Sequence, residues 1–209
     1  MNEAARIGVL VVDDHPLFRD GVAMLVNRQD DMHVVGEAGH GAEAVELCLA
    51  LSPDVVLMDL QMPHMGGIEA VRAIRAARPA IKLIMLTTYK GDVQATQAFA
   101  AGVSGYLLKD MVRKDLVGII RDVHRGRLVV PPEIAQQLAS HMGDEALTLR
   151  EIEVLKCVAL GQSNKRVARS LGITEDTVKS HMSSTLAKLG ANDRTHAVTL
   201  AIQRGIFQL

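Results

Sequence analysis

Three aspartates stand where a parallel β-sheet would bring their side chains together. Asp13 and Asp14 follow one short run of apolar residues, and Asp59 follows another. Carboxylates that converge repel one another unless a cation lies among them, and a cluster of oxygen ligands suits Mg²⁺ better than zinc. We therefore expect these aspartates to form a magnesium site, with simple loop caps as the alternative interpretation for any one of them.

Two other polar groups follow apolar runs in the same way, the hydroxyl of Thr87 and the ammonium of Lys109. Both can bind phosphoryl oxygens, so the set predicts phosphoryl transfer to Asp59 as the nucleophile. Aspartate-based phosphatases carry a general acid two residues after the nucleophile, and here that position is Gln61. We therefore expect a lasting acyl phosphate, with Gln61 and Tyr89 flanking the path of an attacking water.

The elements that would position these groups alternate regularly over residues 1–125. Five short apolar runs predict strands, and an amphipathic stretch that predicts a helix follows each of them. The strands are expected at Ile7–Val12, His33–Glu37, Asp54–Met58, Ile81–Leu86 and Ser104–Leu108, and the helices at Leu17–Arg28, Ala42–Leu51, Ile68–Ala77, Val93–Ala101 and Val112–Arg125. Parallel strands need such crossover helices, so residues 1–125 are expected to form a doubly wound α/β domain with strand order 2-1-3-4-5.

The rest of the chain has no strand signal. Residues 126–147 contain Pro131-Pro132 and Gly143, which predicts a linker with a short helix at Glu133–Met142. Residues 148–209 are expected to form an all-α domain of four helices. The first begins after Thr148, which has Glu151 three residues later as in a capping box, and the others are expected at Asn164–Leu171, Glu175–Leu189 with Thr174 as N-cap, and Arg194–Arg204.

Composition and charge narrow the class of protein. The 209 residues are 48% hydrophobic and 22% charged, which excludes intrinsic disorder, and the apolar runs are too short to cross a membrane. Two distant cysteines exclude a disulfide scaffold and a four-cysteine zinc site. We expect a soluble, cytoplasmic protein without a membrane partner. Its net charge of −1 divides into −3 before Gly126 and +2 after Arg125, which indicates an anionic partner for the second part.

The predicted helix Glu175–Leu189 has the pattern of a DNA-recognition helix. Val178 and Met182 lie on its apolar stripe, while small polar and cationic residues are expected on its outer face: Lys179, Ser180, Ser183 and Ser184. With the preceding short helix and a turn at Gly172, it predicts a helix-turn-helix that enters the major groove of DNA. A helical bundle used only for protein contacts is the alternative.

The first 125 residues resemble the receiver domain of two-component response regulators. The resemblance rests on four stretches: Val11-Val12-Asp13-Asp14-His15, Leu57-Met58-Asp59-Leu60-Gln61-Met62-Pro63, Leu86-Thr87-Thr88 and Gly105-Tyr106-Leu107-Leu108-Lys109-Asp110. It implies that a sensor histidine kinase phosphorylates Asp59. It also implies that Asp14 and the backbone carbonyl of Gln61 hold Mg²⁺ together with Asp59. In the same resemblance Asp13 acts through water, Thr87 and Tyr106 form a switch, and Lys109 binds the phosphoryl group.

Residues 145–209 resemble the LuxR-type DNA-binding domain of NarL/FixJ-like regulators. The motifs are Leu147-Thr148-Leu149-Arg150-Glu151, Gly161-Gln162-Ser163-Asn164-Lys165, Thr177-Val178-Lys179-Ser180-His181 and Lys188-Leu189-Gly190. The resemblance implies that Lys179, Ser180 and Ser183 face the groove, and that Asn164, Lys165 and Thr177 touch phosphates. Thr185 replaces an isoleucine that is usual on the inner stripe, which predicts looser packing of the recognition helix.

Together these features predict a phosphoacceptor transcription factor rather than an enzyme. Phosphorylation is expected to favour a homodimer on two DNA half-sites related by approximate two-fold symmetry, with RNA polymerase as a further candidate partner. Three alternatives stay open: a regulator of this fold controlled by contacts or a ligand without phosphorylation, an aspartyl-phosphate hydrolase, and a dinucleotide site at Gly39–Ala44, which fits a loose glycine-rich fingerprint.

Overall fold

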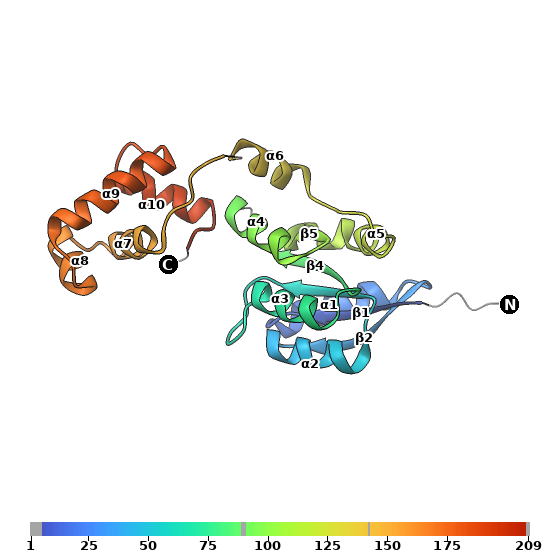
Figure 1. Ribbon diagram of the computed structural model, residues 1–209. Coiled ribbons are helices and arrows are strands. Elements are labelled where there is room, and N and C mark those ends of the chain that lie inside the picture. Colours follow the sequence, from blue (N-terminus) through green and yellow to red (C-terminus); the bar gives the residue numbers. More distant parts are fainter. Residues whose placement is uncertain (1–5, 89–90, 142, 208–209) are drawn as a thin grey trace. The chain divides into compact units, whose positions relative to one another are not determined.

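The computed structural model describes residues 6–88, 91–141 and 143–207. They form two compact units, one built mainly from residues before Gln136 and the other mainly from residues after Ala135. Figure 1 shows that the first combines strands and helices and that the second is helical. Within the described residues, no helix has both the length and the apolar composition needed to cross a membrane.

The first unit contains a sheet of five parallel strands in the order β2-β1-β3-β4-β5, as expected. The strands are β1 (Ile7–Val12), β2 (Met32–Ala38), β3 (Val55–Asp59), β4 (Lys82–Thr87) and β5 (Gly105–Leu108). The helices are α1 (Pro16–Asn27), α2 (Gly41–Leu51), α3 (Gly67–Ala77), α4 (Asp92–Ala101) and α5 (Val112–His124), with the short 3-10 helix η1 (Lys109–Met111) before α5. Every residue of β1, β3 and β5 is buried, which explains their continuous apolar sequence.

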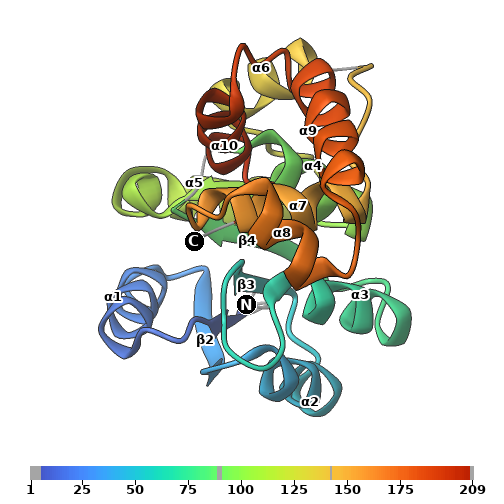
Figure 2. The ribbon, with the colours of Figure 1, turned by 90° about the vertical axis from the view of Figure 1, so that its left-hand side faces the viewer.

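Helices cover both faces of the sheet. Figure 2 shows α1 and α5 on one face and α2 and α3 on the other. The core under α1 and α5 includes Val9 and Leu57 of the strands, Val26 of α1 and Leu116 of α5. This arrangement sends the loops that follow β1, β3, β4 and β5 to one edge of the sheet.

β3 and β4 each end one residue later than expected, so Asp59 and Thr87 are the last residues of these strands rather than the first residues after them. The reason is the parallel register, in which Asp59 lies opposite Leu86. The backbone N–H of Leu60 also donates to the carbonyl of Leu86, at 3.0 Å. Asp59 is thus held by the sheet itself.

The chain after α5 returns to the sheet before it continues. Val129 forms a parallel bridge with Gly105 of β5. Its N–H donates to the carbonyl of Ser104 at 2.9 Å, and its carbonyl accepts from the N–H of Tyr106 at 3.0 Å. The sequence predicts only a linker here, because a bridge of one residue leaves no alternating pattern.

The helices of the second unit begin and end close to the expected residues. They are α7 (Leu149–Ala159), α8 (Asn164–Leu171), α9 (Glu175–Leu189) and α10 (Arg194–Gln203), and α6 (Pro132–Ser140) precedes them. The predicted capping box at Thr148 is confirmed, and Gly172 and Gly190 end α8 and α9 with φ of +66° and +62°. Met142, the expected end of the short helix, lies outside the described residues. Val154, Val167, Val178 and Ala197 belong to the common core.

Candidate functional site

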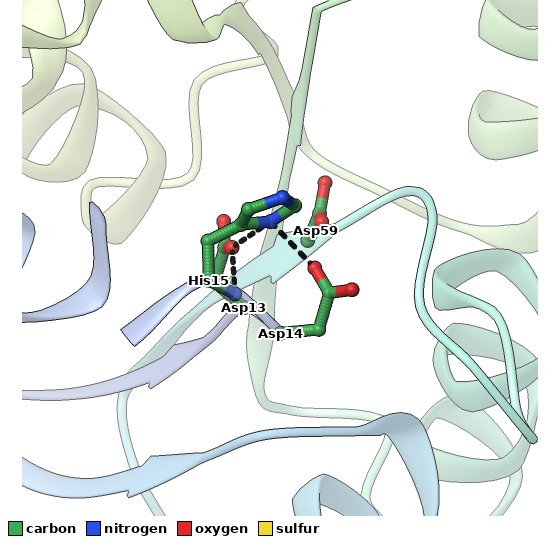
Figure 3. Close-up of side chains that lie close together, drawn as sticks. All are labelled: Asp13, Asp14, His15 and Asp59. Carbon is green, nitrogen blue, oxygen red and sulfur yellow. Dashed lines mark hydrogen bonds and ion pairs between the residues drawn. The ribbon is translucent and has the colours of Figure 1, made fainter. Parts of the chain in front are cut away.

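Four acidic or imidazole side chains converge at the carboxyl edge of the sheet, as Figure 3 shows. They are Asp13, Asp14 and His15 from the segment after β1, and Asp59 at the end of β3, and one ligand atom of each lies within 4.8 Å of the others. Asp13 is fully buried and Asp59 is 3% exposed. The expected meeting of the three aspartates is confirmed, and His15 joins them.

Lys109 places its ammonium between two of these carboxylates. Its Nζ lies 2.7 Å from Oδ2 of Asp13 and 3.1 Å from Oδ1 of Asp59. The ring of Phe18 lies on another side of the ammonium, with its centroid 4.7 Å from Nζ. Burial lowers the pKa of Lys109, but hydrogen bonds and charges from both aspartates outweigh it, so the net shift is upward and the ammonium is retained.

One ammonium does not balance the negative charge of the site. Burial, together with the charge of Asp13, raises the pKa of Asp59 to about 6, although Lys109 and a hydrogen bond from the backbone of Gln61 lower it. A divalent cation among the carboxylates would relieve this repulsion, and the oxygen donors fit Mg²⁺.

Two residues to which the sequence assigned no role fix the backbone of the site. Arg19 of α1 donates from Nη1 to the carbonyl of Asp13 at 2.6 Å and pairs with Glu37 at 3.2 Å. Gly67 begins α3 so close to the end of β3 that a Cβ there would collide with the carbonyl oxygen of Asp59. The adjacent glycines Gly66-Gly67 are a sequence signal for such a close approach, whereas nothing in the sequence distinguishes Arg19 from other helical arginines.

The two residues expected to form a switch lie on neighbouring strands. Thr87 and Tyr106 are 1% and 0% exposed. Burial raises the pKa of Tyr106 to about 12, and the nearby Thr87 hydroxyl opposes the rise. The buried hydroxyl of Tyr106 has no hydrogen-bond partner within the part of the chain that the structure describes. Tyr89, expected to flank the water path, lies outside the described residues, and its role stays a prediction.

The glycine-rich turn at Gly39–Ala44 does not have the form of a phosphate loop. The N–H of Gly39 donates to Oε2 of Glu43 at 2.7 Å, and the N–H of Glu43 donates to Nδ1 of His40 at 3.2 Å. Because side chains of the turn itself occupy these N–H groups, the structure does not favour a dinucleotide there.

In the second unit, α9 exposes the residues expected to face a DNA groove. Lys179, Ser180 and Ser183 are exposed, opposite the buried Val178 and Met182. Nζ of Lys179 lies 2.9 Å from Oδ1 of Asp176.

The residues expected to touch phosphates lie at the beginning of two helices. Asn164 and Lys165 open α8, and Thr177 is in the first turn of α9. Lys165 is exposed, and the other two are partly buried. The Thr177 N–H donates to Oγ1 of the N-cap Thr174 at 3.1 Å, so Thr177 also helps to begin α9.

The expectation that Ser184 faces outward is wrong. Its hydroxyl donates to Oε1 of Glu151 at 2.6 Å, and Lys188 contacts Oε2 of the same carboxylate at 3.0 Å. Glu151 is 4% exposed, so it joins α7 to the recognition helix from a buried position. The reason for the error is that Glu151 has the spacing of a capping residue, and the sequence does not show that its other oxygen faces α9.

Thr185, expected to loosen the inner stripe of the recognition helix, is fully buried. Its Oγ1 donates to the carbonyl of His181 at 2.8 Å. The hydroxyl is thus satisfied within the helix, so its burial leaves no donor without a partner.

Comparisons with known proteins agree with both units. Residues 9–121 match the response regulator receiver domain, and residues 145–201 match the bacterial regulatory proteins of the luxR family. Response regulator protein VraR of Staphylococcus aureus is 41% identical over 207 residues, covering 97% of this chain and 99% of that protein. The crystal structure of response regulator ChrA, from a heme-sensing two-component system, is 36% identical, covers 97% of this chain and 100% of that one, and has a TM-score of 0.58. A complex of response regulator RcsB with DNA shares the fold, at 23% identity, 95% and 98% coverage and a TM-score of 0.70.

Proposed function

This chain belongs to the response regulators in which a receiver domain is followed by a LuxR-type DNA-binding domain, and we propose that phosphorylation of Asp59 controls its binding to DNA. The observation that carries the proposal is the meeting of Asp13, Asp14 and Asp59, with the Lys109 ammonium in contact with Asp13 and Asp59. The phosphoryl donor in the cell is a partner sensor histidine kinase.

The Asp59 carboxylate is suited to act as the nucleophile. With a pKa of about 6 it is ionised at neutral pH. One of its oxygens forms a bond to phosphorus while the bond from phosphorus to the leaving nitrogen of the kinase histidine breaks. Lys109, 3.1 Å from Oδ1, is placed to bind a phosphoryl oxygen.

The acidic pocket supports a magnesium cofactor. Asp13, Asp14, Asp59 and the backbone carbonyl of Gln61 would hold the ion, which supplies positive charge that neutralises the phosphoryl oxygens. The close approach of the Asp13, Asp14 and Asp59 carboxylates supports this assignment. A pocket with Gln61 rather than an acid two residues after the nucleophile favours storage of the phosphoryl group over hydrolysis.

Two further parts of the chain act after phosphorylation: the pair Thr87 and Tyr106, and the DNA-binding helices of the second unit. Thr87 and Tyr106 relay phosphorylation by moving toward the phosphoryl group, which favours a homodimer in the cytoplasm. On DNA, Lys179, Ser180 and Ser183 of α9 face the major groove of each half-site. Asn164, Lys165 and Thr177 touch phosphates, and RNA polymerase is the candidate partner at the promoter.

Intact-mass measurement after treatment with acetyl phosphate and Mg²⁺ tests the site. Wild type is expected to gain the mass of one phosphoryl group, and Asp59→Asn none, because the amide is nearly isosteric but not a nucleophile. Asp20→Asn, at an exposed aspartate of α1, is the matched control and should react as wild type does. Phosphorylation of Asp59→Asn at the wild-type rate would assign the site elsewhere. A wild type that gains nothing would favour control without phosphorylation.

A further inference from the structure

His15 adds a nitrogen donor to a site otherwise made of carboxylates. His15 forms a cluster with Asp13, Asp14 and Asp59. Within the part of the chain that the structure describes, this is the one cluster of three or more His, Cys, Asp or Glu side chains arranged to hold an ion. In Figure 3 the imidazole stands against the carboxylates of Asp13 and Asp14. The proposed phosphoacceptor chemistry assigns no role to this ring.

The distances around Nδ1 of His15 match those between neighbouring ligands of one ion. Nδ1 lies 2.7 Å from Oδ1 of Asp14 and 3.3 Å from Oδ1 of Asp13. Adjacent ligands of an octahedral ion with bonds of about 2.1 Å lie about 3.0 Å apart. An ion that takes these oxygens as ligands therefore has the imidazole nitrogen within reach.

The backbone keeps His15 at this position without restraining its ring. Its N–H donates to Oδ1 of Asp13 at 2.9 Å, and the next residue, Pro16, begins α1. The side chain is 72% exposed, so packing does not prevent the small adjustment that ligation requires.

A nitrogen donor changes which ion the site prefers. Mg²⁺ strongly favours oxygen ligands and keeps several waters, whereas Mn²⁺ and especially Co²⁺ accept an imidazole readily. We propose that His15 is a direct ligand in this site and that it shifts the selectivity of the site from Mg²⁺ toward divalent transition metals such as Co²⁺ and Mn²⁺. This inference rests on the proposed metal site of the receiver.

Calorimetric titration of the full chain with Mg²⁺ and with Co²⁺ tests the selectivity. His15→Asn should weaken Co²⁺ binding about tenfold or more and Mg²⁺ binding less than about threefold, because only Co²⁺ gains substantially from the nitrogen. Asparagine is a favourable residue at the start of a helix, so the variant is expected to fold. The matched control is His124→Asn, an exposed histidine in the last turn of α5.

Electron spin echo envelope modulation of the Mn²⁺-loaded protein tests direct ligation. Wild type and His124→Asn should show modulation from a coordinated nitrogen, and His15→Asn should not. Equal losses of Co²⁺ and Mg²⁺ affinity, or no nitrogen modulation in wild type, would overturn the role of His15 and leave the proposed phosphorylation site intact. If wild type binds none of the three ions, the proposed metal site itself fails, and the inference fails with it.

Discussion

At the scale of single residues, Asp59 combines reactivity with a penalty to folding. Its pKa of about 6 in the folded chain lies above its ordinary value of 3.8, since burial and the charge of Asp13 both oppose ionisation. A carboxyl group with a raised pKa favours folding most below its ordinary pKa, and that contribution is lost as the pH rises through about 6. The receiver should therefore lose stability between about pH 4 and pH 6 when no metal is bound.

Asp59→Asn should remove this penalty. At pH 7.5 without divalent metal, the free energy of unfolding of the first unit is expected to exceed that of wild type by up to about 3 kcal/mol, from the size of the shift in pKa. At pH 4 the difference should nearly vanish. Urea denaturation at both pH values measures it, with Asp20→Asn as control. A constant difference across the pH range would show that the ionisation of Asp59 is not the cause.

Glu151 differs from Asp59 because folding lowers its pKa instead of raising it. Burial alone would raise its pKa, but hydrogen bonds from Ser184, Lys188 and Thr148 dominate and lower the pKa to about 2 from 4.5. The stabilisation is present above pH 4.5 and is lost as the pH falls toward 2. Glu151→Gln should therefore lower the free energy of unfolding of the second unit at pH 7 by up to about 3 kcal/mol. The control is Glu153→Gln, at a carboxylate that is 52% exposed, and an equal loss in both variants would refute the role of burial.

At the scale of elements, α8 and α9 are expected to contribute differently to DNA binding, α8 to affinity and α9 to specificity. A contact to a base edge contributes about 1–3 kcal/mol of discrimination, whereas a phosphate contact strengthens all sequences alike. Lys179→Ala should therefore weaken binding to the cognate site much more than to unrelated DNA. Lys165→Ala should weaken both nearly equally and reduce the salt slope by about 1. Fluorescence anisotropy at several salt concentrations measures the affinity of each variant for cognate and unrelated DNA, and so distinguishes a base contact from a phosphate contact. Unchanged operator affinity of Lys179→Ala would contradict the proposed orientation of α9.

Most helices and strands can be predicted from local sequence patterns. The residue roles that could not be predicted depend on contacts that form only in the folded chain. Buried parallel strands appear as apolar runs, and capping residues such as Thr148 and Thr174 mark where helices begin. The position of Asp59 follows because strand ends gather at one edge. By contrast, Glu151 and Val129 act through partners far along the chain, and Arg19 bonds the carbonyl of Asp13 although nothing in the sequence distinguishes it from other helical arginines.

At the scale of the whole molecule, phosphorylation should change the state of association. Beryllium trifluoride, which mimics a phosphoryl group on aspartate, is expected to convert a mainly monomeric chain into a dimer and to strengthen binding to a two-half-site operator. A phosphoryl group shifts the equilibrium between monomer and dimer only because the two states bind it with different affinity. Weak operator binding is therefore expected even without phosphorylation. Sedimentation measures the mass, and Asp59→Asn should not respond. Unchanged mass and affinity in wild type would exclude this route of control.

The pairing of Val129 with β5 also bears on aggregation. β5 is the last strand of the sheet, and Val129 occupies the backbone groups of Ser104 and Tyr106 that would otherwise lie open at its edge. Open edges of this kind recruit strands from other molecules. A receiver shortened to end at Arg125 should therefore self-associate on storage at high concentration, whereas one that ends at Pro132 should not, and light scattering would distinguish the two. We therefore expect the segment just after α5 to protect the edge of β5 against pairing with a strand of another molecule.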